Sequence, residues 1–370
     1  MKIGIDARLY SQTGVGRYIR NLIKELEKID TKNDYVIFLL PKDSDKIILK
    51  SPQWTKKTIN IKWHSLREQI LLPFILDKEK CDLIHFPYFS VPILYRGKFL
   101  ITVHDLIMNH FSTGYASSLP LPLYKLKFIF YRLIMQIALK KSAKIIAVSK
   151  ATKQEIIDHY SMPDSQISVI YEASEITHKT EDISQNNLSD KKYFLYVGNA
   201  YPHKNLETVV SAFKKISDNY VNVQLILVGG RDYFYTRLLN KIMEQKISNI
   251  ILRVSVSDNE LIYLYKNAVG LIVPSFMEGF GLPAVEAMTL GCPVIASKIS
   301  SLLEICGQAA TYFNPLDSDE LRKIIIQYLE NADPKVRTEQ IQLGFEQVKK
   351  YTWRKAAEKT LEIYESCTGL

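Results

Sequence analysis

Short runs of apolar residues alternate along the chain with longer segments in which apolar residues recur every three or four positions. The short runs are rich in β-branched and aromatic residues, which is typical of strands buried on both faces of a parallel sheet. The first five runs lie at 3–6, 35–40, 82–86, 99–103 and 145–149. Helical segments at 16–29 and 151–160 separate some of them, so this half is predicted to be an α/β domain.

The same pattern then starts again. A second set of predicted strands lies at 193–197, 223–228, 250–254, 271–273 and 294–296. Predicted helices lie between or after them at 205–217, 258–267, 282–290 and 319–330. Ligands of such sheets bind beyond the carboxyl ends of the strands. We therefore expect two Rossmann-like parallel-sheet domains that face each other across a cleft.

A polar stretch at 172–192 is the predicted linker between the two halves. It places an N-terminal domain at 1–175 and a C-terminal domain at 190–350. The last segment, 351–370, carries an apolar stripe with helical spacing, formed by Trp353, Ala356, Ala357, Leu361 and Tyr364.

Composition narrows the class of protein without choosing a function. The net charge of +9 suits phosphates, nucleic acid or an anionic membrane, but no block of Lys and Arg resembles a nucleic-acid arm, so no nucleic-acid partner is expected. The four cysteines form no Cys-x-x-Cys pair and are expected to be reduced in the cytoplasm. The amino terminus has no apolar run long enough for a signal peptide.

The segment at 119–144 is the most lipid-like part of the chain, but its charges argue against a membrane-spanning helix. Lys125, Arg132, Gln136 and Lys140 fall on one side of a helix and Lys127 on the other. The pattern favours a core helix, and a helix lying on anionic lipid at the inner face of the membrane is the alternative.

Two predicted strands of the first half end in candidate site residues. After Asp6, a turn with Gly14 and Gly16 leads into a helix, where glycines let backbone N–H groups approach a phosphate. Ile19 occupies the place of a third glycine, which counts against a dinucleotide-binding dehydrogenase. Another strand ends at His104 and Asp105, where the histidine is placed to donate to a sugar hydroxyl and the aspartate to fix its tautomer or orient an acceptor.

In the second half, the strand ending at Val197 runs into a loop that contains Asn199, His203 and Lys204. A helix is predicted to start near Lys204. A lysine there is mildly unfavourable against the helix dipole, and this cost favours a role as a point charge over a diphosphate. His203 is the candidate for a second donor.

The most specific motif extends from Val273 to Met288. A strand ends, a turn holds Gly279, Phe280 and Gly281, and a helix begins at Leu282 with Pro283 in its first turn. The N–H groups at this helix start are suited to an anion. Glu278 and Glu286 would repel a phosphate there, so we expect them to bind the paired hydroxyls of a sugar and a ribose.

These motifs resemble those of the GT-B glycosyltransferases of family 4, also called group 1, which retain the anomeric configuration. The resemblance covers nearly the whole chain and rests above all on two glutamates eight positions apart with Gly279-Phe280-Gly281 between them. The opening GIDARLYSQTGVGRYIRNL is similar to the bacterial mannosyltransferase branch.

The resemblance implies a role for each matching residue. Glu286 is expected to hold the ribose hydroxyls, and Glu278 the hydroxyls of the transferred sugar together with the N–H groups of 280–282. Lys204 is expected to neutralise the leaving diphosphate. His104 is expected near the sugar ring, Gly16 near the phosphates and Val256 beside the base. The helix around Trp353 is expected to cross back onto the first domain.

Three positions depart from the family pattern. Asn199 stands where an arginine is common, His203 where an arginine often precedes the lysine, and Val254 where a glycine usually stands two places before the base-contacting residue. One fixed cation is therefore missing, and a protonated His203 is the expected substitute.

The resemblance implies transfer that needs no metal and no cofactor. The co-substrate is expected to be a nucleotide diphosphate sugar, and GDP-mannose is the first candidate. The acceptor is expected to be a saccharide or lipid-linked saccharide of a bacterial surface polysaccharide. Asp43-Ser44-Asp45 raises a metal-dependent transferase as an alternative, while Asp317-Ser318-Asp319 is better explained as a helix start. A non-catalytic sugar-nucleotide binding protein and an epimerase or phosphorylase of the same fold remain as further alternatives.

Overall fold

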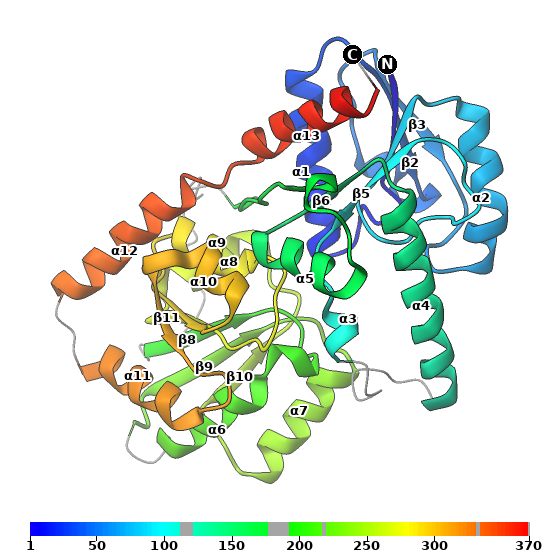
Figure 1. Cartoon of the computed structure of the whole chain (residues 1–370). Helices are drawn as coiled ribbons and strands as arrows, with labels where there is room; N and C mark the ends of the chain where they lie inside the picture. The colour runs from blue at the N-terminus through cyan, green and yellow to red at the C-terminus, as the bar shows by residue number, and fades with distance from the viewer. Residues whose placement is uncertain (112–120, 177–191, 217–219, 331–333, 369–370) are drawn as a thin grey trace. The chain divides into compact units, whose positions relative to one another are not determined.

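The computed structural model describes residues 1–111, 121–176, 192–216, 220–330 and 334–368. Its internal contacts divide the chain into two units (Figure 1). Unit 1 comprises Met1–Met108, Leu119–Ala173 and Tyr351–Leu370, and unit 2 comprises Asn109–Ser118 and Ser174–Lys350.

Unit 1 is built on a seven-stranded sheet in the order β3-β2-β1-β4-β5-β6-β7, with every neighbouring pair parallel. The strands are β1 (Lys2–Asp6), β2 (Asp34–Leu39), β3 (Trp54–Thr58), β4 (Leu83–Phe86), β5 (Phe99–Val103), β6 (Lys144–Ala147) and β7 (Ile167–Val169). The two edge strands, β3 and β7, were not predicted. After Trp54, every residue of β3 is exposed, so it lacks the apolar run of a buried strand.

The helices of unit 1 are α1 (Gly14–Ile29), α2 (Leu66–Glu79), α4 (Leu121–Lys141), α5 (Lys150–Tyr160) and α13 (Trp353–Thr368). The short α3 (Ile107–His110) extends from unit 1 into the first residues of unit 2. Helix α13 packs against α1 and β4. Its Tyr364 OH lies 2.7 Å from His85 Nδ1 in β4, so the end of the chain is fixed to the sheet of unit 1 by a buried hydrogen bond.

Unit 2 holds a six-stranded parallel sheet in the order β10-β9-β8-β11-β12-β13. The strands are β8 (Lys192–Val197), β9 (Val223–Val228), β10 (Ile250–Arg253), β11 (Gly270–Val273), β12 (Val294–Ser297) and β13 (Ala310–Phe313). The helices are α6 (Leu206–Ile216), α7 (Tyr233–Glu244), α8 (Asp258–Asn267), α9 (Leu282–Thr289), α10 (Ser300–Cys306), α11 (Ser318–Glu330) and α12 (Pro334–Val348). Phe194, Phe213, Leu225 and Ile272 are fully buried in the core between them. The two Rossmann-like sheets confirm the predicted fold class.

The predicted linker is shorter than its polar composition indicated. Glu172 and Ala173 are buried and belong to unit 1, so the polar stretch begins inside that unit. Glu172 is buried because it pairs with His104, which follows β5, and this partner could not be recognised from the sequence. Residues 177–191 lie outside the described part of the chain.

None of the helices in the described residues combines the length and the apolar composition that crossing a bilayer requires. Helix α4 does not fit the core-helix prediction completely. It buries Tyr124, Tyr131, Met135, Ala138 and Leu139, and it leaves a second set of apolar side chains exposed.

Candidate active site

Lys204 lies where the loop after β8 is held against the end of β11. The loop ends in a 3-10 turn, Pro202–Lys204, and Asn205 then adopts a left-handed conformation (φ 56°) before α6 begins. The prediction that a helix starts near Lys204 is confirmed, since α6 (Leu206–Ile216) begins two residues later, with Asn205 between the turn and the helix. The Asn205 amide donates to the carbonyls of Pro274 (2.9 Å) and Pro315 (2.8 Å), and this fixes the loop.

Lys204 and Glu278 form the central ion pair of unit 2. Lys204 Nζ donates to Glu278 Oε1 at 2.7 Å, and Ser275 Oγ donates to the same oxygen at 2.6 Å. Burial opposes ionisation of Glu278, but the charge and hydrogen bond of Lys204, with the hydrogen bond of Ser275, outweigh it and hold the pKa of Glu278 below its usual range. The pair thus presents one anchored cation and one anchored anion.

His203, next to Lys204 in the chain, is buried in an environment that favours its neutral form. Burial, reinforced by the charge of Lys204, lowers the pKa of His203 to about 4, although Glu278 acts in the opposite direction. The expectation that a protonated His203 replaces a missing arginine is therefore wrong for the protein by itself, because a neighbouring ammonium and an apolar environment both disfavour the charged ring.

The turn before α9 requires glycine at one position. Gly281 has φ +92°, and a Cβ there would lie 2.7 Å from Leu302 Cδ2. Gly281 caps α9, and Pro283 follows in the first turn. In the first turn of α9, Pro283 has no N–H and Ala284 N donates to the Gly281 carbonyl at 2.9 Å, so the Leu282 N–H is the donor at this helix start that suits an anion. Phe280 beside it is buried.

Glu286 lies in α9 and is held by a tyrosine. Its side chain is buried, and Tyr265 OH in α8 donates to Glu286 Oε2 at 2.9 Å. One oxygen of the carboxylate is therefore oriented by the protein. The expected role of Glu286, holding ribose hydroxyls, stays a prediction.

The other predicted donor-binding residues of unit 2 lie in loops that follow strand ends. Asn199 follows β8, and its side chain accepts from Tyr201 N (3.4 Å). Val256 lies between β10 and α8, directly before Ser257, which caps α8. The left-handed residue of this loop is Ser255 rather than Val254, so the valine in place of the family glycine carries no backbone strain.

In unit 1, the loop after β1 folds closely over the start of α1. A Cβ on Gly16 would lie 2.6 Å from the Tyr10 carbonyl oxygen and 3.0 Å from that of Leu9. Gly16 is therefore required by backbone packing, whereas a Cβ on Gly14 would meet nothing within 4 Å. Their expected contact with phosphate stays a prediction.

His104, just beyond β5, is paired with a carboxylate that was not predicted. Its Nδ1 lies 2.7 Å from Glu172 Oε1 and its Nε2 lies 2.9 Å from the Pro87 carbonyl. Both neighbours are acceptors, and this arrangement favours the doubly protonated ring. Burial opposes this charge, but the hydrogen bond and charge of Glu172 prevail and raise the pKa of His104.

Asp105 does not hold His104. Its Oδ1 accepts from the backbone N–H of Ile107 at 3.1 Å, as expected for a residue that precedes a helical turn. The prediction that Asp105 fixes the tautomer of His104 is therefore wrong, because the Nδ1 partner of the ring is Glu172. Orientation of an acceptor by Asp105 stays a prediction.

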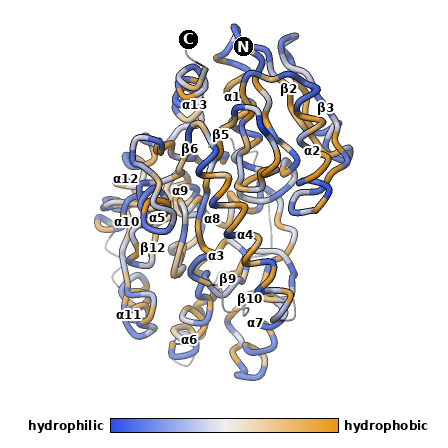
Figure 2. Tube along the Cα trace, turned by 45° about the vertical axis from the view of Figure 1, so that its right-hand side comes forward, coloured by the Kyte–Doolittle hydropathy of each residue, from blue (hydrophilic) through white to orange (hydrophobic). Residues whose placement is uncertain are grey.

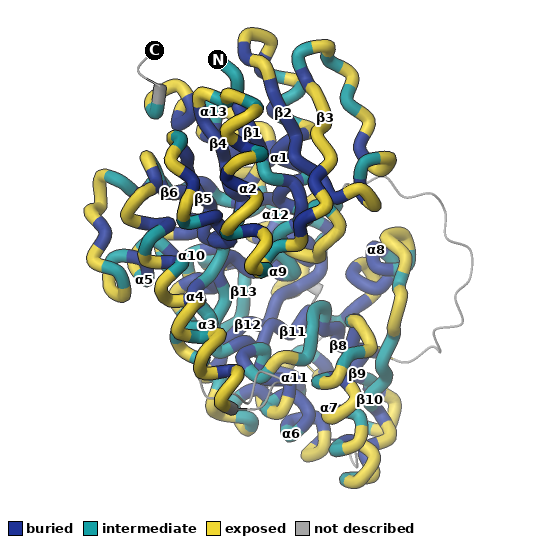
Figure 3. Tube along the Cα trace, turned by 90° about the vertical axis from the view of Figure 1, so that its right-hand side faces the viewer, coloured by how far each residue is buried: buried dark blue, intermediate teal, exposed yellow. Residues whose placement is uncertain are grey.

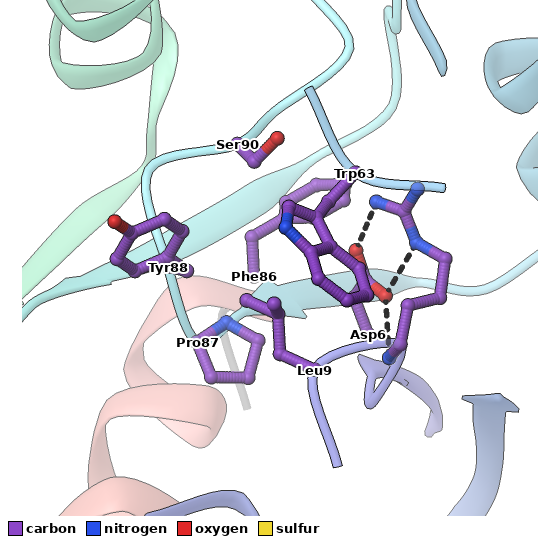
Figure 4. A pocket seen from close by; sticks show the side chains of 8 residues that line it. Asp6, Leu9, Trp63, Phe86, Pro87, Tyr88 and Ser90 are labelled. Atoms are coloured by element: carbon purple, nitrogen blue, oxygen red, sulfur yellow. Dashed lines mark hydrogen bonds and ion pairs between the residues drawn. The ribbon is translucent and has the colours of Figure 1, made fainter. Parts of the chain in front are cut away.

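A second group of charges at the carboxyl end of the unit 1 sheet lies beside a small pocket (Figure 4). The fully buried Arg8 donates to Asp6 and to Glu68, at 2.6 Å and 2.7 Å from Nη2. Asp6, Arg8 and Leu9 line the pocket together with Trp63, Phe86, Pro87, Tyr88 and Ser90. The arginine thus balances two carboxylates next to an aromatic wall.

The two aspartate motifs have structural partners. Asp43 is buried and accepts from Ser11 Oγ (2.5 Å) and Lys46 Nζ (2.9 Å). Asp317 accepts from the backbone N–H groups of Asp319 and Glu320, both at 2.9 Å. The interpretation of the second motif as a helix start is confirmed.

Family models agree with this geometry. Residues 12–173 match the model described as Glycosyltransferase Family 4, and residues 178–345 match the model described as Glycosyl transferases group 1. The O-antigen chain mannosyltransferase RfbU of Salmonella typhimurium is 30% identical over 71% of this chain and 67% of its own length. The chain belongs to the family 4, group 1 glycosyltransferases.

Other relatives of this glycosyltransferase match over almost its whole length. The O-antigen chain mannosyltransferase B of Escherichia coli is 26% identical over 96% of this chain and 97% of its own. Among solved structures, sucrose-phosphate synthase from Thermosynechococcus elongatus has a TM-score of 0.80 at 22% identity and covers 99% of this chain and 98% of its own. HepE from Anabaena, solved with UDP-glucose, has a TM-score of 0.76 at 18% identity, with 99% and 100% coverage. These structures confirm the GT-B fold.

Sequence reasoning missed several residues that support the site of the glycosyltransferase. Ser275 and Tyr265 orient the two glutamates, but nothing in their local sequence distinguishes them from other polar side chains. Glu172 lies in a stretch that looks like a linker. For Arg8, the short distance to Asp6 in sequence was an available signal, because the two residues flank a strand end.

Proposed function

We propose that this glycosyltransferase transfers a hexose, with mannose as the first candidate, from a nucleoside diphosphate sugar to a saccharide or lipid-linked saccharide in the cytoplasm. The observation that carries the proposal is the Lys204–Glu278 pair next to the start of α9. An ammonium and helix N–H groups suit a diphosphate, and an anchored carboxylate suits sugar hydroxyls. Two relatives are named as O-antigen chain mannosyltransferases. Their names support mannose as the transferred sugar and a surface saccharide as the acceptor.

We further propose transfer with retention and without a metal. Lys204 and the N–H groups of α9 stabilise the charge that develops on the leaving diphosphate, and this oxyanion takes the proton of the acceptor hydroxyl as the glycosidic bond breaks. To reach the phosphate, Lys204 gives up or shares its hydrogen bond with Glu278. Ser275 then remains to hold the carboxylate in place for the sugar hydroxyls.

A panel of GDP-, UDP-, ADP- and TDP-sugars in thermal-unfolding measurements tests the donor. The cognate donor at a hundred times its Kd stabilises the protein by about 2.7 kcal/mol. GDP-mannose is expected to give the largest shift, and a larger shift with another sugar nucleotide would replace it.

Product analysis tests the reaction. Nucleoside diphosphate release that needs a saccharide acceptor, persists in EDTA and yields the donor's anomeric configuration by NMR is the expected result. Donor binding without turnover would instead indicate a sugar-nucleotide binding protein, and a free sugar phosphate or epimerised donor would indicate a phosphorylase or epimerase.

A further inference from the structure

Large apolar side chains are exposed together on one part of unit 1. They are Leu66, Ile70, Leu71 and Phe74 on α2, Leu94 in the following loop, and Leu123, Leu126, Ile129, Phe130 and Leu133 on α4. We call this set the α2–α4 surface. Half of the twenty large apolar side chains that are exposed in the described residues belong to it, and such a concentration marks an interaction site rather than chance exposure.

The two helices are joined through one loop. The Gln69 side chain in α2 donates to the Val91 carbonyl (3.3 Å) and accepts from Ile93 N (2.9 Å). Lys141 in α4 donates to the Ile93 carbonyl (2.9 Å). Figure 3 shows α2 and α4 both turned toward the viewer with long exposed stretches. The two helices therefore lie on the same side of unit 1.

Helix α4 has two apolar faces. Tyr124, Tyr131, Met135 and Ala138 are spaced three or four residues apart and form its buried face. Leu123, Leu126, Phe130 and Leu133 have the same kind of spacing and form the opposite, exposed face. Figure 2 shows apolar residues along most of α4. One face accounts for packing on the sheet, and the other needs a different partner.

The charges on α4 indicate which partner this is. Its 21 residues include Lys125, Lys127, Arg132, Lys140 and Lys141 and no Asp or Glu. By helical spacing, Lys125 and Arg132 flank one side of the exposed apolar row and Lys127 the other. A basic border around an apolar face complements the anionic headgroups and the acyl boundary of a phospholipid bilayer.

We propose that the α2–α4 surface rests on an anionic phospholipid membrane, with the exposed apolar side chains inserted at the headgroup level and the lysines and Arg132 against the phosphates. This inference does not depend on the proposed donor or acceptor, because it rests on side chains outside the candidate active site. The sequence of α4 left two roles open, a core helix and a helix on lipid. In this proposal α4 has both roles, since one face packs in the core and the other contacts lipid.

Flotation of the full chain with vesicles tests the proposal. Binding to vesicles of phosphatidylglycerol and phosphatidylethanolamine is expected, with far weaker binding to phosphatidylcholine alone and a decrease in high salt. The double substitution Ile129→Glu/Phe130→Glu is expected to lower partitioning at least about tenfold, because it places two charges at the lipid boundary. Lys125→Gln/Lys127→Gln/Arg132→Gln is expected to lower it by roughly a hundredfold on anionic vesicles.

Met243→Glu/Leu316→Glu is the matched control, since it converts two exposed apolar residues of unit 2 outside this surface and is expected to bind like the unmodified chain. Circular dichroism and the thermal-unfolding midpoint, measured without vesicles, check that each variant is folded. No flotation, or equal flotation of Ile129→Glu/Phe130→Glu, overturns the proposal. A dimer in light scattering that this double substitution dissociates overturns it in favour of a second copy of the chain.

Discussion

The position and charge of several site residues in this glycosyltransferase depend on hydrogen-bond partners far away in sequence. Lys204 and Glu278 are 74 positions apart, and His104 and Glu172 are 68 apart. In each pair the hydrogen-bonded carboxylate lies directly against the cation. Burial lowers the pKa of both His104 and His203. At His104 the hydrogen bond and charge of Glu172 outweigh burial, whereas at His203 the charge of Lys204 adds to it.

Replacing Lys204 by alanine is expected to lower the transfer rate by a factor that corresponds to about 3 kcal/mol in the barrier, since a preorganised charge at the leaving group is lost. Steady-state rates of nucleotide release measure this. Lys215→Ala is the control, because Lys215 pairs with Asp319 at an exposed position. A Lys204→Ala enzyme as fast as the Lys215→Ala enzyme would contradict the role of Lys204.

Replacing Glu172 by glutamine is expected to lower the pKa of His104, because the charge and hydrogen bond that raise it are weakened while burial remains. An NMR titration of the imidazole nitrogens measures the shift. Asp105→Asn is the matched control and is expected to give a smaller change, since Asp105 Oδ1 accepts from Ile107 N and both ring nitrogens of His104 have other partners. Equal shifts in both variants would show that Glu172 has no special part.

At the scale of elements, two helix starts depend on glycine for different reasons. Gly16 allows the carbonyls of the loop after β1 to lie against α1, and Gly281 supplies a left-handed residue before α9. Both starts lie at the carboxyl end of a parallel sheet, the edge at which ligands of such sheets bind. The glycines therefore set the backbone path at these two helix starts.

Substitution of Gly281 by alanine is expected to lower the free energy of unfolding by about 2 kcal/mol, because φ +92° is strained for an L-residue and the added Cβ meets Leu302. Donor affinity is expected to fall as well, since the start of α9 shifts. Chemical denaturation and calorimetry measure the two effects. In Gly230→Ala the Cβ meets nothing within 4 Å, so that variant should change neither.

At the scale of the whole molecule, each unit contains a buried neutral histidine. Burial lowers the pKa of His85 to about 3, and burial with the Lys204 charge lowers that of His203 to about 4. The unfolded chain binds these protons near pH 6.5, so folding is favoured above that pH and the stability is lost as pH falls toward the folded values. The raised pKa of His104 acts in the opposite direction, and its contribution is lost as pH rises.

Unfolding free energy is therefore expected to decrease between about pH 6 and pH 4, by at most about 1.4 kcal/mol per pH unit for each neutral histidine. Denaturant titrations over this range measure the slope. His203→Gln is expected to flatten it for unit 2, because glutamine keeps polar atoms but takes up no proton. An unchanged slope in this variant would show that His203 is already charged in the folded protein.

The sequence by itself determined the repeated strand–helix pattern, the strand ends and the glutamates around Gly279–Gly281. These follow from periodicity and turn chemistry within about ten residues, and parallel strands gather their carboxyl ends at one edge without further information. The edge strands β3, β7 and β13 were not predicted because their apolar signal is weak: β3 is exposed after its first residue, β7 has three residues, and β13 is only partly buried.

Only the tertiary structure decided which groups are charged and what holds them. The partner of His104 is Glu172 rather than its neighbour Asp105, and burial together with the charge of Lys204 lowers the pKa of His203. The second apolar face of α4 also became visible only when the first was seen to be buried. Proton affinity and exposure depend on everything within a few ångströms in space, and chain neighbours are a small part of that environment.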